Sequence, residues 1–70
     1  MITLNGKYYS GEAALVYDDN DKTATIAYKG KALVPVGYRY NIEGQTWEVT
    51  SCSRSNYNPA VLNIRIQKNA

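Results

Sequence analysis

The chain has 70 residues and a formal net charge of +2, with no His, no Phe, one Cys and seven Tyr. Without His, no imidazole can activate a Ser or Cys nucleophile or bind a metal ion, and a single Cys excludes an internal disulfide framework and a Cys-rich zinc site. We therefore predict one non-enzymatic domain over residues 1–70 that uses no cofactor.

The size of the chain limits the core that it can build. A domain of this length buries only about 60 % of the surface that its unfolded chain exposes, which leaves marginal stability and favours self-association or docking onto a partner. The N-terminus lacks the basic start and apolar run of a signal peptide, and the longest apolar run, residues 32–36, is too short to cross a membrane. We expect a cytoplasmic protein with a protein partner and no membrane partner.

The N-terminal third of the chain contains two turn signals around one strand. Asn5-Gly6 is the dipeptide that favours a type I′ hairpin, because both central residues of that turn have positive φ. Residues 10–17 are interpreted as a strand because an apolar run, Leu15-Val16-Tyr17, leads into the polar turn formed by residues 18–22.

Strict alternation follows in residues 23–28, where Ala24, Ile26 and Tyr28 share one face. Lys29-Gly30 is a weaker hairpin signal, and Pro35-Val36-Gly37 breaks the chain before the next strand. That strand, residues 38–42, carries Tyr38, Tyr40 and Ile42 on one face.

The C-terminal part begins with a further hairpin signal, Glu43-Gly44. Beyond it Trp47, Val49 and Ser51 alternate, so we expect Cys52 on the opposite face as a small filler or half-exposed residue. Residues 53–59 form the longest irregular stretch and are predicted to be a loop. In the last strand the inward side chains are Leu62, Ile64 and Ile66.

These patterns predict an all-β fold with little or no helix. We expect five to seven short antiparallel strands in a small barrel or meander of SH3-like or OB-like type, since closure removes the exposed edges that a short open sheet could not protect. In such a fold Ile64→Asp should abolish folding, whereas Arg65→Glu should be tolerated.

No group of residues predicts catalysis or metal binding. Asp18, Asp19 and Asp21 resemble a loop of oxygen ligands, but an EF-hand would need a Gly and a later bidentate Glu, so we interpret the cluster as a solvated turn. Glu43 and Glu48 have no apolar surroundings in the sequence that would separate their pKa values for acid–base work.

The tyrosines favour a binding surface, although they must also supply the bulky core that Phe would otherwise provide. A phenol ring suits both places because one end is apolar and the other polar. Arg54 and Tyr57 in the 53–59 loop are interface residue types on a backbone expected to protrude. The candidate interface residues are Arg54, Tyr57, Arg39, Tyr38 and Tyr40.

The run Gly37-Tyr-Arg-Tyr-Asn-Ile-Glu-Gly-Gln-Thr-Trp-Glu-Val-Thr-Ser, followed after a loop by Leu62-Asn-Ile-Arg-Ile, resembles the C-terminal half of small bacteriophage head–tail joining and head-closure adaptor proteins. The resemblance implies a non-enzymatic β-barrel that forms rings or docks during virion assembly, in the host cytoplasm or the virion. The chain is shorter than those proteins and has no evident helix, and no functional residue can be transferred.

Three functions therefore remain open. The first is an assembly module that acts as a homo-oligomer or adaptor and is encoded by a phage. The second is a small phage-encoded inhibitor that blocks a host defence protein or sequesters its ligand. The third is a barrel that binds single-stranded nucleic acid, because basic residues flank four of the seven tyrosines. The net charge of +2 is small for such a module.

Overall fold

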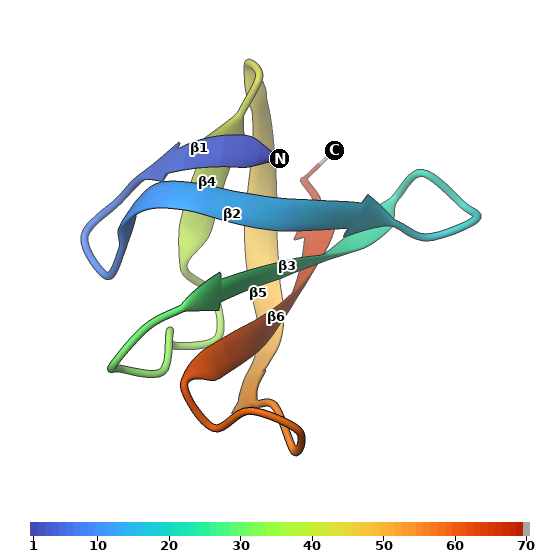
Figure 1. The fold of residues 1–70 in the computed structure, drawn as a ribbon. Helices are drawn as coiled ribbons and strands as arrows, with labels where there is room; N and C mark the ends of the chain where they lie inside the picture. Colours follow the sequence, from blue (N-terminus) through green and yellow to red (C-terminus); the bar gives the residue numbers. More distant parts are fainter. Residues whose placement is uncertain (70) are drawn as a thin grey trace.

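Six antiparallel strands account for most of the chain in a computed structural model that describes residues 1–69 (Figure 1). Their bounds are β1 (Ile2–Asn5), β2 (Ser10–Tyr17), β3 (Thr23–Lys29), β4 (Arg39–Ile42), β5 (Gln45–Arg54) and β6 (Val61–Lys68). The strand order is β1-β2-β3-β6-β5-β4. The described residues contain no helix, and hence none that could span a bilayer.

The two edges of this sheet approach each other. β1 and β4 end the strand order, yet the two strands are in contact, so the sheet curls into a nearly closed small barrel. The prediction of a small antiparallel barrel with five to seven strands is confirmed. No ladder joins β1 to β4 in the described residues, so each keeps a main-chain edge, and the shortness of both strands limits what is exposed there.

The core lies along β3 and β6, where the predicted alternation holds at every position. In the register of this pair Ala24 faces Ile66, Ile26 faces Ile64 and Tyr28 faces Leu62, and all six side chains are buried. The next strands in the sheet, β5 and β4, contribute Trp47, Val49, Tyr40 and Ile42. Burying one large apolar side chain contributes about 1.5–3 kcal/mol, so the packing of these side chains is the main source of stability.

A β-bulge at Thr50 changes the alternation of β5. Val49 pairs with Ile66 and Ser51 pairs with Arg65, so Thr50 has no paired residue in the β6 register, although its hydroxyl donates to the Arg65 carbonyl at 3.2 Å. The extra residue exchanges the inward and outward positions of the side chains that follow it in β5. Ser51 is therefore exposed and Cys52 packs against the core, and the prediction that Cys52 lies on the face opposite Trp47 and Val49 is wrong.

The predicted turns are confirmed only in part. Glu43 and Gly44 have φ of 53° and 81° between the paired residues Ile42 and Gln45, which is the two-residue type I′ hairpin expected. Asn5-Gly6 does not form one, because Gly6 has no positive φ and the turn continues to Tyr9.

Gly6 instead allows the side chain of Tyr38 to come close to the main chain of the turn. A Cβ at this position would lie 2.9 Å from the hydroxyl oxygen of Tyr38, a separation that side-chain carbon atoms do not tolerate. The Lys29-Gly30 signal is also not a hairpin, since β3 pairs with β2 and β6 and the chain enters a long loop after Lys29.

The predicted loop at residues 53–59 begins later than expected. β5 continues through Ser53 and Arg54, which pair with Asn63 and Leu62, so the irregular segment is 55–60. The polar turn at residues 18–22 is present as predicted, and Asp21 has a φ of 58° within it.

Candidate functional site

The barrel has two ends that differ in chemistry. At one end β3 finishes at Lys29, β5 finishes at Arg54 and β6 begins at Val61, and the loops 30–38 and 55–60 leave the barrel here. We call it the loop end; it lies at the bottom of Figure 1. The other end, which we call the pocket end, carries the turn at residues 18–22 and the Glu43-Gly44 hairpin.

Arg54 ties the two loops of the loop end together. Its Nη1 donates to the carbonyl oxygens of Gly30 at 3.2 Å and Pro59 at 3.0 Å, and its Nη2 donates to the carbonyl of Lys31. The planar guanidinium offers several donors in a rigid fork, which suits it to joining separate main-chain segments. Arg54 was predicted as an interface residue, and the structure shows its guanidinium engaged within the chain.

Tyr57 stands at the tip of the 55–60 loop and is fully exposed, at 100 % of its reference surface. Polar contacts hold the backbone beneath it. Ser55 Oγ accepts hydrogen bonds from the N–H groups of Tyr57 at 3.2 Å and Asn58 at 3.4 Å, and the carbonyl of Asn58 accepts one from Val61 at 2.9 Å. The loop therefore presents an aromatic ring on an ordered backbone.

The charged side chains in the segments that build the loop end are all positive. Lys29, Lys31 and Arg54 belong to the loop end and are exposed, and residues 23–37 and 49–69 contain no Asp or Glu. Leu33, in the neighbouring loop, adds an apolar side chain that is more than half exposed. Aromatic and apolar side chains surrounded by cations make this end a candidate docking surface.

The pocket end holds a shallow pocket of about 320 Å³. Its lining consists of Tyr17, Asp21, Ile42, Glu43, Gln45, Trp47 and Lys68. Trp47 is only 2 % exposed, and the half-exposed ring of Tyr17 lies 5.9 Å from it between centroids. Lys68 Nζ lies 5.5 Å from the Trp47 centroid, within range of a cation–π contact. The pocket thus combines aromatic rings with two carboxylates and one ammonium.

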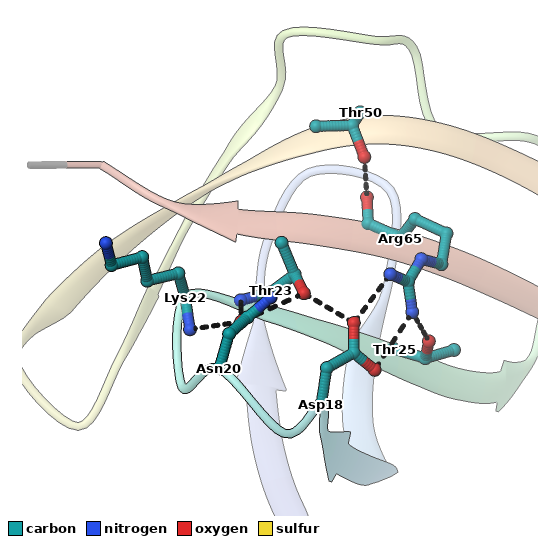
Figure 2. Close-up of polar contacts among 7 residues, drawn as sticks. All are labelled: Asp18, Asn20, Lys22, Thr23, Thr25, Thr50 and Arg65. Carbon is teal, nitrogen blue, oxygen red and sulfur yellow. Dashed lines mark hydrogen bonds and ion pairs between the residues drawn. The ribbon is translucent and has the colours of Figure 1, made fainter.

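An ion pair fixes the turn beside this pocket, as Figure 2 shows. Arg65 in β6 meets Asp18 through Nη2 and Oδ2 at 2.6 Å and through Nη1 and Oδ1 at 3.3 Å, and its Nη1 also donates to Thr25 Oγ1 at 2.7 Å. The Thr23 hydroxyl donates to Asp18 as well. The Arg65 guanidinium first, and then the Thr23 hydroxyl, lower the pKa of the Asp18 carboxyl.

The same turn is ordered by Asn20. Its Oδ1 accepts hydrogen bonds from the main-chain N–H groups of Lys22 at 2.8 Å and Thr23 at 3.0 Å (Figure 2). Asp18 thus faces Arg65 rather than its acidic neighbours. Within residues 1–69 no three His, Cys, Asp or Glu side chains are grouped so that they could hold a metal ion.

The remaining candidate interface residues are buried or engaged with other parts of the chain. Tyr40 is buried, with its hydroxyl 3.4 Å from that of Tyr28, and burial raises the pKa of both phenols. Tyr38 is half-buried and accepts a hydrogen bond from the Lys7 N–H at 3.0 Å. Arg39 is exposed on the outer wall, 3.6 Å from a carboxylate oxygen of Glu48.

Of the five predicted residues, Arg54 and Tyr57 belong to the loop end, whereas Tyr38 and Tyr40 pack against each other in an aromatic cluster. Their ring centroids are 4.9 Å apart in an edge-on arrangement, and Tyr8 packs on Tyr38 at 5.0 Å. Tyr9 stacks on Tyr28 at 3.9 Å. These rings do the packing that Phe would do in another core.

Sequence reasoning missed the pocket. Trp47 and Lys68 face each other across β5 and β6, and Tyr17 reaches them from the end of β2. Three segments far apart in the chain build this site, so no local motif marks it. The one available signal was the exposed apolar pair Val16-Tyr17 directly before a polar turn.

The chain matches no protein-family model, and no curated protein or solved structure is significantly similar to it. The resemblance of residues 37–66 to phage adaptor proteins therefore stays a prediction, and the two ends of the barrel are the basis for a functional proposal.

Proposed function

We propose that this chain is a non-enzymatic assembly module that associates with further copies of itself through the loop end. One observation carries the proposal: Tyr57 is fully exposed on a loop whose backbone is held by Arg54 and Ser55. An aromatic ring on a preorganised loop loses little conformational entropy on binding, which is the typical property of an interface hot spot.

The amount of exposed apolar surface supports association. The side chains of Met1, Val16, Tyr17, Leu33, Val36 and Tyr57 are each at least half exposed in a chain of 70 residues. A buried Tyr can contribute about 150–250 Å² of contact area, more than any other exposed apolar side chain here offers. The resemblance to phage adaptors, which act as rings or docking parts, points in the same direction.

The experiment is a measurement of molar mass by sedimentation or light scattering from micromolar to millimolar concentration. We expect the mass to rise above the 7.8 kDa of one chain as concentration increases. Tyr57→Ala should weaken association about tenfold or more, which corresponds to about 1.4 kcal/mol. Tyr57→Phe keeps the ring and is the matched control. A wild-type chain that stays at 7.8 kDa at millimolar concentration contradicts the proposal.

A second candidate function, binding of single-stranded nucleic acid, is favoured by the presence of Tyr57, Lys29 and Lys31 at the same end of the barrel. Stacking of a base on an exposed ring contributes about 1–3 kcal/mol, and nearby cations attract the phosphates. Titration of a fluorescent oligothymidine at low and high salt tests it. Salt-sensitive binding that Tyr57→Ala removes supports this function, and the absence of binding at low salt contradicts it.

A further inference from the structure

We infer that the loop end docks onto the pocket end of a second copy, with Tyr57 of one chain packed against Tyr17 of the next. This inference rests on the proposed function and specifies its geometry. It makes the contact head-to-tail: each copy offers two different surfaces, and the same surface never meets itself.

The pocket has the size and lining that a phenol ring requires. Its volume of about 320 Å³ exceeds what one aromatic side chain fills. The half-exposed ring of Tyr17 provides the accessible aromatic part of its lining, whereas Trp47 and Ile42 are almost fully covered. Two aromatic rings attract each other through offset or edge-to-face packing, in addition to the area that they bury. The carboxylates of Asp21 and Glu43 are acceptors that line the same space and suit a phenol hydroxyl.

Charge favours the same pairing. The loop end carries Lys29, Lys31 and Arg54 without a carboxylate in its segments. In the pocket the two carboxylates of Asp21 and Glu43 outnumber the ammonium of Lys68. Two loop ends would repel each other, whereas a loop end and a pocket end attract, so electrostatics selects the head-to-tail contact over a symmetric one between loop ends.

The barrel wall next to the pocket is open and adds apolar surface. β1 pairs with residues 10–13 of β2 only, so residues 14–17 have β3 on one side and no strand of the described part of the chain on the other. Val16 in this stretch is 64 % exposed. A second copy that docks at the pocket can therefore also cover the exposed Val16 side chain and the unpaired main-chain edge of residues 14–17.

The two surfaces lie at opposite ends of one strand, which determines what association produces. β5 runs from Gln45, in the lining of the pocket, to Arg54, at the loop end. A copy can use both ends at once, and repeated head-to-tail contacts give a closed ring or an open filament, depending on the rotation between copies.

Two variants, each with one of the two docking surfaces disabled, test the head-to-tail contact. The loop-end variant combines Tyr57→Ala with Lys31→Glu, and the pocket-end variant combines Tyr17→Thr with Glu43→Lys. Each keeps one surface intact, so each alone should remain at the 7.8 kDa of a single chain at a concentration where the wild type associates. Circular dichroism verifies that both fold. Glu12→Lys, a charge reversal on the exposed wall, is the control that should associate like the wild type.

Mixing the two variants in equal amounts is the decisive step. The intact loop end of the pocket-end variant should then occupy the intact pocket of the loop-end variant, and the mass should double and stop there. If the wild type associates and the mixture stays monomeric, the head-to-tail geometry is wrong while self-association stands. If the wild type itself remains monomeric, the proposed function fails and this inference fails with it.

Discussion

The main-chain N–H of Val34 donates a hydrogen bond to the Sγ of Cys52 over 3.3 Å, although the two residues lie 18 positions apart. The contact exists because the bulge at Thr50 turns Cys52 inward. Val34 is buried, so this hydrogen bond fastens the long loop 30–38 onto the core. The single Cys of the chain is therefore a packing residue that also anchors a loop.

Cys52→Asp should destabilise the protein far more than Ser51→Asp. A carboxylate at position 52 would lose most of its hydration against the core, and the single N–H of Val34 cannot replace it, at a cost of about 2–3 kcal/mol. Position 51 faces water, and a carboxylate there should change stability by less than about 0.5 kcal/mol. Urea unfolding of both variants measures the difference. Regular alternation without a bulge predicts the reverse order, so that order would contradict the bulge.

Arg54→Lys should loosen the loop end while preserving its charge. An ammonium cannot reach the three carbonyl oxygens that the guanidinium fork joins, and we expect a loss of about 1 kcal/mol at this exposed site. Limited chymotrypsin digestion should then cleave faster after Tyr57. Lys31→Gln, which alters charge at the same end but breaks no side-chain hydrogen bond, is the control. Equal cleavage rates in both variants would rule out the clamp.

Asp18→Asn should lower the thermal midpoint at neutral pH and have no effect in strong acid. Arg65 and Thr23 hold the folded pKa of Asp18 below the usual 3.8, so the stabilisation is complete above that value and is lost as pH falls through the folded pKa. Thermal scans between about pH 2 and pH 7 follow the gap between wild type and variant. A gap that is the same at all pH values contradicts the role of the ion pair.

Tyr40→Phe should make the protein less sensitive to alkali. Burial, together with the neighbouring Tyr28, raises the pKa of Tyr40 above the usual 10.0, so its contribution to stability is complete below that pH and is lost as pH rises toward the folded pKa. Thermal midpoints measured across alkaline pH should fall less steeply in the variant. Identical slopes would show that Tyr40 ionises freely in the folded protein.

Gly44→Val should cost about 1–3 kcal/mol and Gly44→Asn clearly less, as measured by urea unfolding. The φ of 81° is the reason, because a Cβ here would meet nothing within 4 Å. A β-branched residue resists this backbone conformation, whereas Asn tolerates it. If the two variants were equally stable, backbone strain would not be the cause.

Arg65 illustrates what side-chain alternation can predict and what it cannot. Alternation correctly places Arg65 outside and Ile64 inside. It also predicts that Arg65→Glu is tolerated, and we now expect that variant to be destabilised, because it would set two carboxylates against each other at Asp18. Asp18, the partner of Arg65, lies 47 positions away in the sequence, and a local sequence pattern cannot identify so distant a contact.

The candidate site was predictable to a similar extent. The exposure of Tyr57 was predictable because connecting loops rich in turn-forming residues run over the surface. The pocket was not, since Tyr17, Trp47 and Lys68 come from three strands that meet only in the folded sheet.

The sequence by itself determined the strand class, the inward faces of β3 and β6 and the type I′ turn at Glu43-Gly44. These depend on side-chain alternation and on φ preferences, which act between near neighbours in the chain. The tertiary structure alone decided the register shift at Thr50, the inward position of Cys52 and the clamp made by Arg54. Each of these depends on which distant main-chain groups lie opposite, and strand pairing across the whole barrel sets that.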